Sequence, residues 1–330
     1  VAKVAKTSPG HLKAERDEPP KPSEAFQFGI LVHAATLEAE TFADRVIEIP
    51  ESAAKVADWR KATIKKATKN FACEHCEHDI QKGDENYVLS TKRCHVECIG
   101  KAPADTFRDA LVDLEARGLL VGTTAAELDT ERGSAWFHVD RTRFLAKPSQ
   151  LRTIERIRAA LADHVIEGTD LSALELLQSG RREISGYSCL DFCDVAIRCD
   201  SLHVDGVPEL SRALGWPASV GIVADLKTSD TADVGRWPFH CRDFLYDLQA
   251  AFYCDIAEAI EGRPFRFVWV VVEKTAPFAV GVFGASAEDH ETGRALYRPA
   301  LAALDEATTS GEWPLYTRRP IETTTAKRRK

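Results

Sequence analysis

Two segments of the chain have apolar residues at helical spacing. A helix is predicted over 28–46, with His33 beside its apolar face. That face consists of Ile30, Ala34 and Leu37. A second helix is predicted over about 149–165, because its apolar residues recur every three or four positions. They are Leu151, Ile154, Ile157, Leu161 and Val165.

Beyond residue 180 the pattern changes to short apolar runs that are typical of strands. Strands are predicted over 182–189, 193–202 and 220–229, and a long helix over 238–262 that ends at Gly262. The runs RFVWVVVEK and APFAVGVFG then predict a hairpin. The order strand, strand, strand, helix, strand, strand indicates an α/β core with a mixed sheet.

The ends of the chain are polar, and we expect 1–25 and 319–330 to be flexible tails. The rest is predicted to form one core from 26–69 and 146–318, which the segment 70–145 interrupts. No stretch approaches the roughly 20 apolar residues of a membrane-spanning helix. The N-terminal sequence also lacks the apolar stretch of a secretory signal. We therefore expect a cytoplasmic protein that contacts no membrane.

Composition narrows the function classes only partly. A chain of 330 residues with 44% hydrophobic residues can bury a full core and carry an insertion. The formal net charge of −8 argues against a protein that coats nucleic acid. Net charge does not decide the matter, because a protein that acts on nucleic acid without coating it needs only local basic patches.

The candidate chemistry centres on Asp225 and Lys227 in the run GIVADLKTS. Residues two apart in a strand face the same side, so the pair can hold a divalent cation and activate a water. Asp200, at the end of the preceding run, supplies a second carboxylate, and Glu183 a third. The alternative is a surface ion pair, but the apolar surroundings favour a site. As an exposed metal carboxylate, Asp225 is expected to contribute little to packing.

The helix after this strand carries a polar stripe of aromatic and amide residues. Tyr246, Gln249 and Tyr253 share one face at spacings of three and four. A different face is formed by Phe244, Leu248 and Phe252. A polar stripe usually faces solvent, but Tyr and Gln are not the Lys and Glu of a typical exposed face. Contact with a substrate phosphate or base is the alternative interpretation.

Four of the nine cysteines crowd into Cys73 to Cys98. The pairs Cys73-x2-Cys76 and His95-x2-Cys98 have the spacing of a tetrahedral structural Zn²⁺ site. His95 restores the two-residue spacing, whereas the neighbouring Cys94 is the alternative third ligand. The pattern resembles the CxxC…HxxC half of LIM and related treble-clef fingers. The competing interpretation is a metal-free loop with incidental cysteines.

Several motifs together resemble one known family. They are E-x-S in REIS, R-x-D in IRCDS, DLKT, QAAFY, VVEKTAPFAVGVF and GEWPLY. In this order they resemble the PD-(D/E)XK exonucleases of the RecE, or exonuclease VIII, type, over 26–66 and 146–318. The segment GILVHAATLEAETF is similar to that family's N-terminal helix, which carries a functional histidine. Cys199 stands where the family usually has proline, and a long loop follows Asp200.

The resemblance implies a restriction-endonuclease-like α/β core, with the zinc element as a small insertion. The active-site residues that it implies are His33, Glu183, Asp200, Asp225, Lys227, Gln249 and Tyr253. It also implies that Mg²⁺ or Mn²⁺ is held by Glu183, Asp200, Asp225 and the backbone carbonyl of Leu226. Without the resemblance, His33 would be interpreted as a partly buried histidine that bonds the backbone of an amphipathic helix.

The implied activity is that of a metal-dependent exodeoxyribonuclease that degrades linear double-stranded DNA. The family further implies 5′ to 3′ digestion, 3′ single strands left for recombination, a phage-type annealing protein as partner, and a homo-oligomer. One alternative is a single-strand or nicking nuclease of the same fold, against which the lack of a cysteine trio after Lys227 argues. The other is a zinc-dependent DNA- or protein-binding module with an inert core, against which the retained acids argue.

Overall fold

The chain folds into two compact units in the computed structural model. The core unit comprises Val1–Glu38 and Arg156–Lys330, and the inserted unit comprises Ala39–Glu155. The structure describes residues 1–18, 23–48, 63–73, 78–89, 92–99, 112, 116, 144–190 and 193–315. The predicted tail 319–330 and much of the predicted insertion 70–145 lie outside these residues. Within them, no helix has the length and apolar character needed to cross a membrane.

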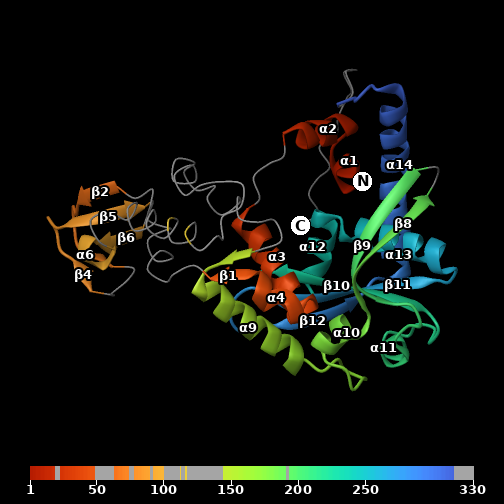
Figure 1. The fold of residues 1–330 in the computed structure, drawn as a ribbon, viewed down its shortest axis with the longest axis horizontal. Coiled ribbons are helices and arrows are strands. Elements are labelled where there is room, and N and C mark those ends of the chain that lie inside the picture. Colours follow the sequence, from red (N-terminus) through yellow and green to blue (C-terminus); the bar gives the residue numbers. More distant parts are fainter. Residues whose placement is uncertain are drawn as a thin grey trace. The chain divides into compact units, whose positions relative to one another are not determined.

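A five-stranded mixed sheet forms the centre of the core unit, in the order β12-β11-β10-β9-β8 (Figure 1). The strands are β8 (Arg181–Leu190), β9 (Cys193–His203), β10 (Gly221–Ser229), β11 (Phe265–Glu273) and β12 (Val280–Gly284). β10 and β11 run parallel, and the other neighbours are antiparallel. The predicted strands, the hairpin and the mixed sheet are therefore confirmed.

Helices cover both faces of this sheet, which explains why its central strands are continuous apolar runs. α13 (Tyr246–Glu261) packs against β8, β9 and β11, and α14 (Ala287–Ser310) packs against α13. α3 (Glu24–Leu37) and α10 (Ala173–Ser179) pack on the other face. The remaining helices of this unit include α11 (Pro208–Ala213) and α12 (Trp237–Phe244).

Three predicted helices differ from the structure in detail. The helix predicted over 238–262 is divided into α12 and α13 at Leu245, which has left-handed backbone angles. The helix predicted over 28–46 is α3 followed by α4 (Ala39–Arg45), and its Ile30 is exposed. α9 (Pro148–Asp163) ends before Val165, which is therefore exposed as well.

The N-terminal residues are ordered helices rather than the flexible tail that their composition predicts. Ser8 caps α2 (Pro9–Asp17), and α1 (Ala2–Lys6) precedes it. α1 packs against α14, which buries Val4 (Figure 1). The amide of Gly10 donates to the carbonyl of Pro314 at 2.9 Å. A few contacts with the rest of the core unit thus order a polar sequence.

The inserted unit begins at Ala39, so 39–69, which the sequence places in the nuclease core, belongs with the insertion instead. Its described elements are small. Besides α4 and the first residues of α9, they are β1 (Val46–Glu48) parallel to β7 (Phe144–Ala146), the sheet of β2 (Thr63–Lys66), β5 (Glu85–Leu89) and β6 (Lys92–His95), the pair β3 (Phe71–Ala72) and β4 (Asp79–Ile80), and α6 (Val96–Ile99). Such small sheets bury little surface, which is typical of elements that need a metal for stability.

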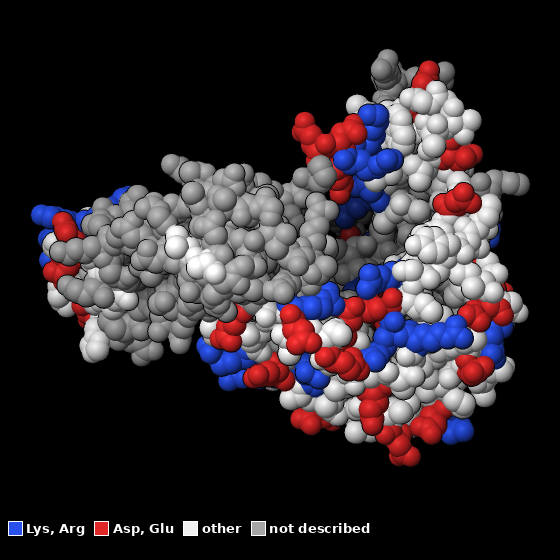
Figure 2. Space-filling model, viewed as in Figure 1, with Lys and Arg blue, Asp and Glu red and all other residues white. Residues whose placement is uncertain are grey.

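Charged side chains are interspersed on the surface. On the face in Figure 2, Lys and Arg alternate with Asp and Glu over the described part of the chain, and neither sign dominates. On this face the mixture of signs leaves no extended basic surface for coating nucleic acid.

Two strands of the sheet have an irregular point at which their side chains switch from one face of the sheet to the other. In β8 this point is Glu183, and in β9 it is Asp200. Ile184 packs with the core that contains α13, whereas Arg182, two residues earlier, donates to the carbonyl of Leu37 in α3. Residues two apart in a regular strand face the same side. Glu183 between them has a φ of 50°, a left-handed conformation that is strained for a residue with a Cβ.

We predict that this strain is measurable by substitution. Both Glu183→Ala and Glu183→Gly remove the carboxylate, but glycine adopts a φ of 50° without the steric cost. The glycine variant is therefore expected to be more stable than the alanine variant by about 1 kcal/mol in free energy of unfolding, measured by urea denaturation.

The same pair of substitutions at Ser185 is the matched control. Ser185 is exposed on the same strand and is not among the described residues with positive φ. Alanine should therefore be the more stable variant there, because glycine loses more backbone entropy on folding. An alanine variant at Glu183 as stable as the glycine variant would show that the strand is not strained at this position.

Candidate active site

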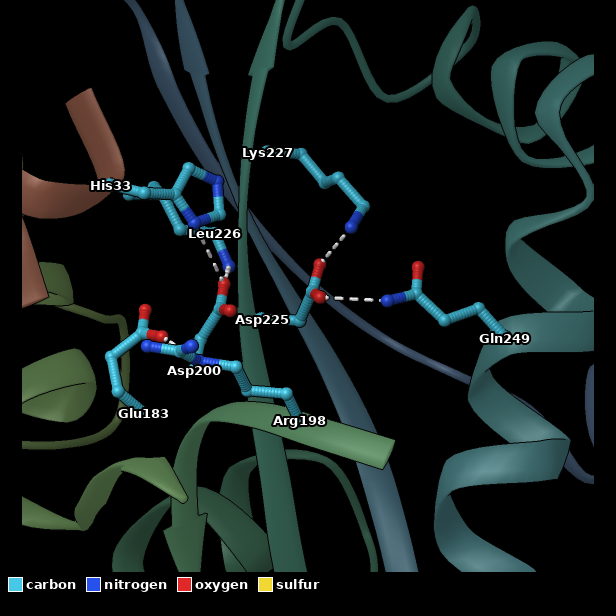
Figure 3. Close-up of polar contacts among 8 residues, drawn as sticks. All are labelled: His33, Glu183, Arg198, Asp200, Asp225, Leu226, Lys227 and Gln249. Atoms are coloured by element: carbon cyan, nitrogen blue, oxygen red, sulfur yellow. Dashed lines mark hydrogen bonds and ion pairs between the residues drawn. The ribbon is translucent and has the colours of Figure 1, made fainter. Parts of the chain in front are cut away.

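Side chains from five elements meet where β9 and β10 separate (Figure 3). His33 comes from α3, Glu183 from β8, Asp200 from β9, Asp225 and Lys227 from β10, and Gln249 from α13. The structure thus brings together residues that lie far apart in the sequence, as predicted. In the view of Figure 3, His33 lies on one side of the acids and Gln249 on the other.

Asp200 occupies the point at which the β9–β10 ladder ends. The paired residues run from Ile222 with His203 to Ala224 with Ser201. Beyond this point the Asp200 carboxylate accepts a hydrogen bond from the backbone amide of Leu226, at 2.8 Å. A side chain therefore takes the place of a strand partner, and this bond fixes the carboxylate beside β10.

His33 approaches the same carboxylate from α3. Its Nδ1 lies 3.4 Å from Asp200 Oδ2, the oxygen that also accepts the Leu226 amide. The structure therefore places His33 beside the acids, although its catalytic role stays a prediction. Burial lowers the pKa of the His33 imidazole, which favours the neutral ring, the form that can bind a metal.

Glu183 is held by Arg198, a residue that the sequence analysis did not single out. The Arg198 guanidinium donates to Glu183 through Nε, and its Nη2 lies 3.7 Å from Oε1 of Glu38. Arg198 precedes Asp200 by two residues in the R-x-D motif. A basic residue two positions before a candidate ligand in a strand was the available signal.

His33, Glu183 and Asp200 have the donor atoms of a metal site. One ligand atom from each lies within 4.8 Å of the other two. Imidazole nitrogen and carboxylate oxygen suit a divalent cation such as Mg²⁺ or Mn²⁺. Asp225 does not belong to this group, and Leu226 contacts the site through its amide. The ligand set that the resemblance implies, with Asp225 and the Leu226 carbonyl, therefore stays a prediction, and His33 is an additional candidate ligand.

Asp225 forms the second half of the site and is buried rather than exposed. Only 4% of the residue is accessible. Its Oδ2 pairs with the Lys227 ammonium, and Gln249 Nε2 donates to its Oδ1 at 2.9 Å. The expectation that this carboxylate contributes little to packing is therefore wrong, because its loss would leave a buried ammonium unpaired.

The site concentrates negative charge in a poorly solvated place. Burial raises the pKa of the Asp200 carboxyl well above its ordinary value, and the neighbouring Asp225 carboxylate raises it further. Burial alone would lower the pKa of Lys227, but the carboxylates of Asp225 and Asp200 outweigh it, so the pKa rises. Lys227 is therefore an ammonium at neutral pH, suited to stabilising negative charge rather than to taking up a proton.

The two tyrosines of α13 differ in their contacts. The ring of Tyr246 lies under the ammonium of Lys227, with 5.0 Å between Nζ and the ring centroid. The ring of Tyr253 packs edge-on against Phe267, with 6.2 Å between centroids. Burial raises the pKa of both hydroxyls. Gln249 and Tyr246 thus contact the Asp225–Lys227 pair directly, whereas the ring of Tyr253 packs against Phe267.

The cysteine cluster lies in the inserted unit. Cys73 Sγ lies 3.7 Å from Cys94 Sγ and 3.8 Å from Cys98 Sγ, and the three residues are not in disulfides. A ligand atom of His95 is also within 4.8 Å of those of Cys73 and Cys98. Cys76, the remaining predicted ligand, lies outside the described residues. The structure therefore brings both candidates for the third ligand to the cluster.

A match to a protein family supports the core fold. Residues 218–320 match a family described as a PDDEXK-like domain of unknown function. A solved structure of a candidate exonuclease from Eubacterium rectale is 14% identical, with a TM-score of 0.39 over 68% of this chain and 77% of its own. No curated protein matches the chain. The matched family segment contains β10, α13 and β11, and the α/β core with its mixed sheet is PD-(D/E)XK-like, as the sequence predicts.

Proposed function

We propose that the core unit is a metal-dependent nuclease that degrades linear double-stranded DNA from its ends. The observation that carries this proposal is the arrangement of two adjoining groups. His33, Glu183 and Asp200 offer three metal ligands, and Asp225 orients the Lys227 ammonium beside them. A phosphodiester next to both groups would meet a cation and a hydrogen-bond donor at once.

Each residue has a distinct part in the proposed hydrolysis. A divalent cation bound to the first group would polarise the phosphate and activate a water for attack. The Leu226 amide fixes Asp200, and Arg198 fixes Glu183, so two of the ligands are preorganised. Lys227 would donate to a phosphate oxygen and stabilise the charge that develops there, while Gln249 holds the Asp225 carboxylate in place.

The finer features of the proposal rest on the family resemblance. The ordered motifs support Mg²⁺ or Mn²⁺ as cofactor and 5′ to 3′ digestion that leaves 3′ single strands for recombination. They also support an annealing protein as partner and further copies of this chain in a homo-oligomer. The match of 218–320 to a PDDEXK-like family is consistent with nuclease chemistry at Asp225 and Lys227.

The test is digestion of linear duplex, circular duplex and single-stranded DNA by the purified full chain in Mg²⁺. We expect linear duplex to be degraded and circular duplex to stay intact.

Asp225→Asn and Lys227→Ala should abolish hydrolysis, because the oriented ammonium is lost. His33→Ala should reduce turnover roughly 10²-fold, with DNA affinity in Ca²⁺ little changed.

The matched control is Lys13→Ala, which breaks an exposed Lys–Asp ion pair in α2. It should leave the rate unchanged, since exposed pairs contribute little. Circular dichroism and thermal unfolding confirm that each variant is folded, which matters because Asp225 is buried. Cutting of circular duplex would favour the nicking alternative, and a folded Lys227→Ala variant with the wild-type rate would refute the assigned site.

We further propose that the inserted unit binds a structural Zn²⁺. A zinc–sulfur bond of about 2.3 Å gives a tetrahedral edge of about 3.8 Å, close to the separations of Cys73 from Cys94 and Cys98. The Cys73–Cys94 distance fits this edge, but the residues whose ligand atoms all lie within 4.8 Å of one another are Cys73, His95 and Cys98, so His95 stays the third ligand and Cys94 the alternative. The spacing of the first pair makes Cys76 the fourth. The main-chain amide of His95 donates to Cys73 Sγ at 3.4 Å, a bond that would stabilise the thiolate.

Zinc analysis of single variants tests this ligand set. Protein purified without chelator is expected to contain about one zinc per chain. His95→Ala should lose the metal and Cys94→Ala should retain it, as elemental analysis would measure. Wild-type protein without zinc would rule the site out, and loss of zinc in Cys94→Ala alone would transfer the ligand role to Cys94.

A further inference from the structure

A series of stacked aromatic rings leads from Lys227 to the protein surface. The ring of Tyr246, which lies 5.0 Å from the Lys227 ammonium, stacks on the ring of Phe244 at 5.7 Å and an interplanar angle of 21°. Phe244 is 60% exposed. One partly buried ring and one exposed ring thus connect the candidate active site with solvent.

The inner end of the series is rigidly supported. Tyr246 also stacks on Trp237, at 5.6 Å and 28°, and Trp237 in turn stacks on Phe283 at 5.5 Å. Trp237 is almost completely buried. Phe244 therefore rests on a ring whose own position is fixed by the core, and the ring of His240 lies 5.9 Å from it on the same helix.

The backbone is strained at the residue that turns Phe244 outward. Leu245 has φ 58° and ψ 43°, left-handed values that are unfavourable for leucine. In one continuous helix, Phe244 would share a face with Leu248 and Phe252, which are both buried. The break at Leu245 removes Phe244 from that face and leaves it in solvent.

Two unfavourable features therefore coincide beside the candidate active site. A strained leucine and an exposed phenylalanine each cost stability, and such features cluster at functional sites. Phe239, on the same helix, is also more than half exposed, and the guanidinium of Arg242 lies over its ring at 5.3 Å. α12 thus presents aromatic surface next to a cation, the combination that binds single-stranded nucleic acid.

We propose that Phe244 is a stacking platform for an unpaired base of the DNA strand whose phosphate reaches Lys227. The inference rests on the proposed nuclease function and adds the form of the substrate, a strand end that is unpaired at the site. A nucleobase suits Phe244 because every base has a flat π-face, so stacking tolerates any sequence. The ring series makes this surface continuous with the phosphate-binding lysine.

Binding measurements on four forms of the full chain test the proposal. Wild type, Phe244→Ala, Phe244→Leu and Phe244→Trp are titrated, in Ca²⁺, with a single-stranded oligonucleotide and with a duplex that has an unpaired end. Phe244→Ala should weaken both complexes about 5- to 150-fold, the range expected for loss of one base–aromatic stack. Phe244→Leu should be similarly weak, because it restores apolar volume without a ring, whereas Phe244→Trp should bind as wild type does.

The matched control is Tyr187→Ala, which removes an exposed aromatic ring from β8. It should leave both affinities unchanged. As a direct probe, an oligonucleotide with 2-aminopurine near its end should lose fluorescence on binding wild type but not Phe244→Ala, because stacking quenches this base.

The outcomes separate the two proposals. If wild type neither binds nor cuts DNA, the nuclease function fails and the platform fails with it. If wild type cuts DNA but Phe244→Ala or Phe244→Leu binds like wild type, only the platform is refuted. Unchanged DNA binding by Phe244→Ala together with capture of a protein segment on α12 would assign the surface to a protein partner.

Discussion

The hydrogen bond from the Leu226 amide to the Asp200 carboxylate determines how the rest of the site is arranged. β9 and β10 stop pairing at Ala224 and Ser201, and this bond spans the point where they part. Without it, a buried amide would lack its strand partner and a buried carboxylate would be free to rotate. The bond fixes the oxygen that His33 approaches, and therefore the position in which a cation could bind.

The second constraint is the concentration of carboxylates in a place with little solvent. Glu183, Asp200 and Asp225 face two cationic side chains, Lys227 and Arg198. Lys227 pairs with Asp225 and Arg198 with Glu183 and Glu38, whereas the Asp200 carboxylate has a main-chain amide and the imidazole of His33 as its neighbours. The three acids thus differ in their partners: Asp225 pairs with a lysine, Glu183 with an arginine, and Asp200 with a main-chain amide.

The sequence predicts the strands and the centre of the site well, because both depend on local regularities. Strands covered on both faces need continuous apolar runs, and a polar pair within such a run is conspicuous. Gln249 follows from helical spacing on the next element. The break at Leu245 has no glycine or proline to mark it, so the exposure of Phe244 is not predictable from spacing.

Other features depend on contacts between distant segments and escape local analysis. The polar N-terminal residues are helical because Val4 finds an apolar surface on α14. The boundary of the inserted unit at Ala39 follows from which segments pack together, and no change in composition marks it. Arg198 is missed because an arginine next to an acid is common, and only the fold shows that it reaches Glu183.

The arrangement of three consecutive residues in β10 has a consequence for how such an enzyme could change its substrate. Asp225 and Lys227 turn their side chains toward α13, while the peptide between them donates to Asp200. One segment of a central strand thus serves both halves of the site, and that strand is paired with a neighbour along its whole length. A movement of β10 that changed the position of the Asp225–Lys227 pair would also move the Leu226 amide that holds Asp200. New specificities would therefore arise from α12 and the surrounding loops, which can vary while the strand stays fixed.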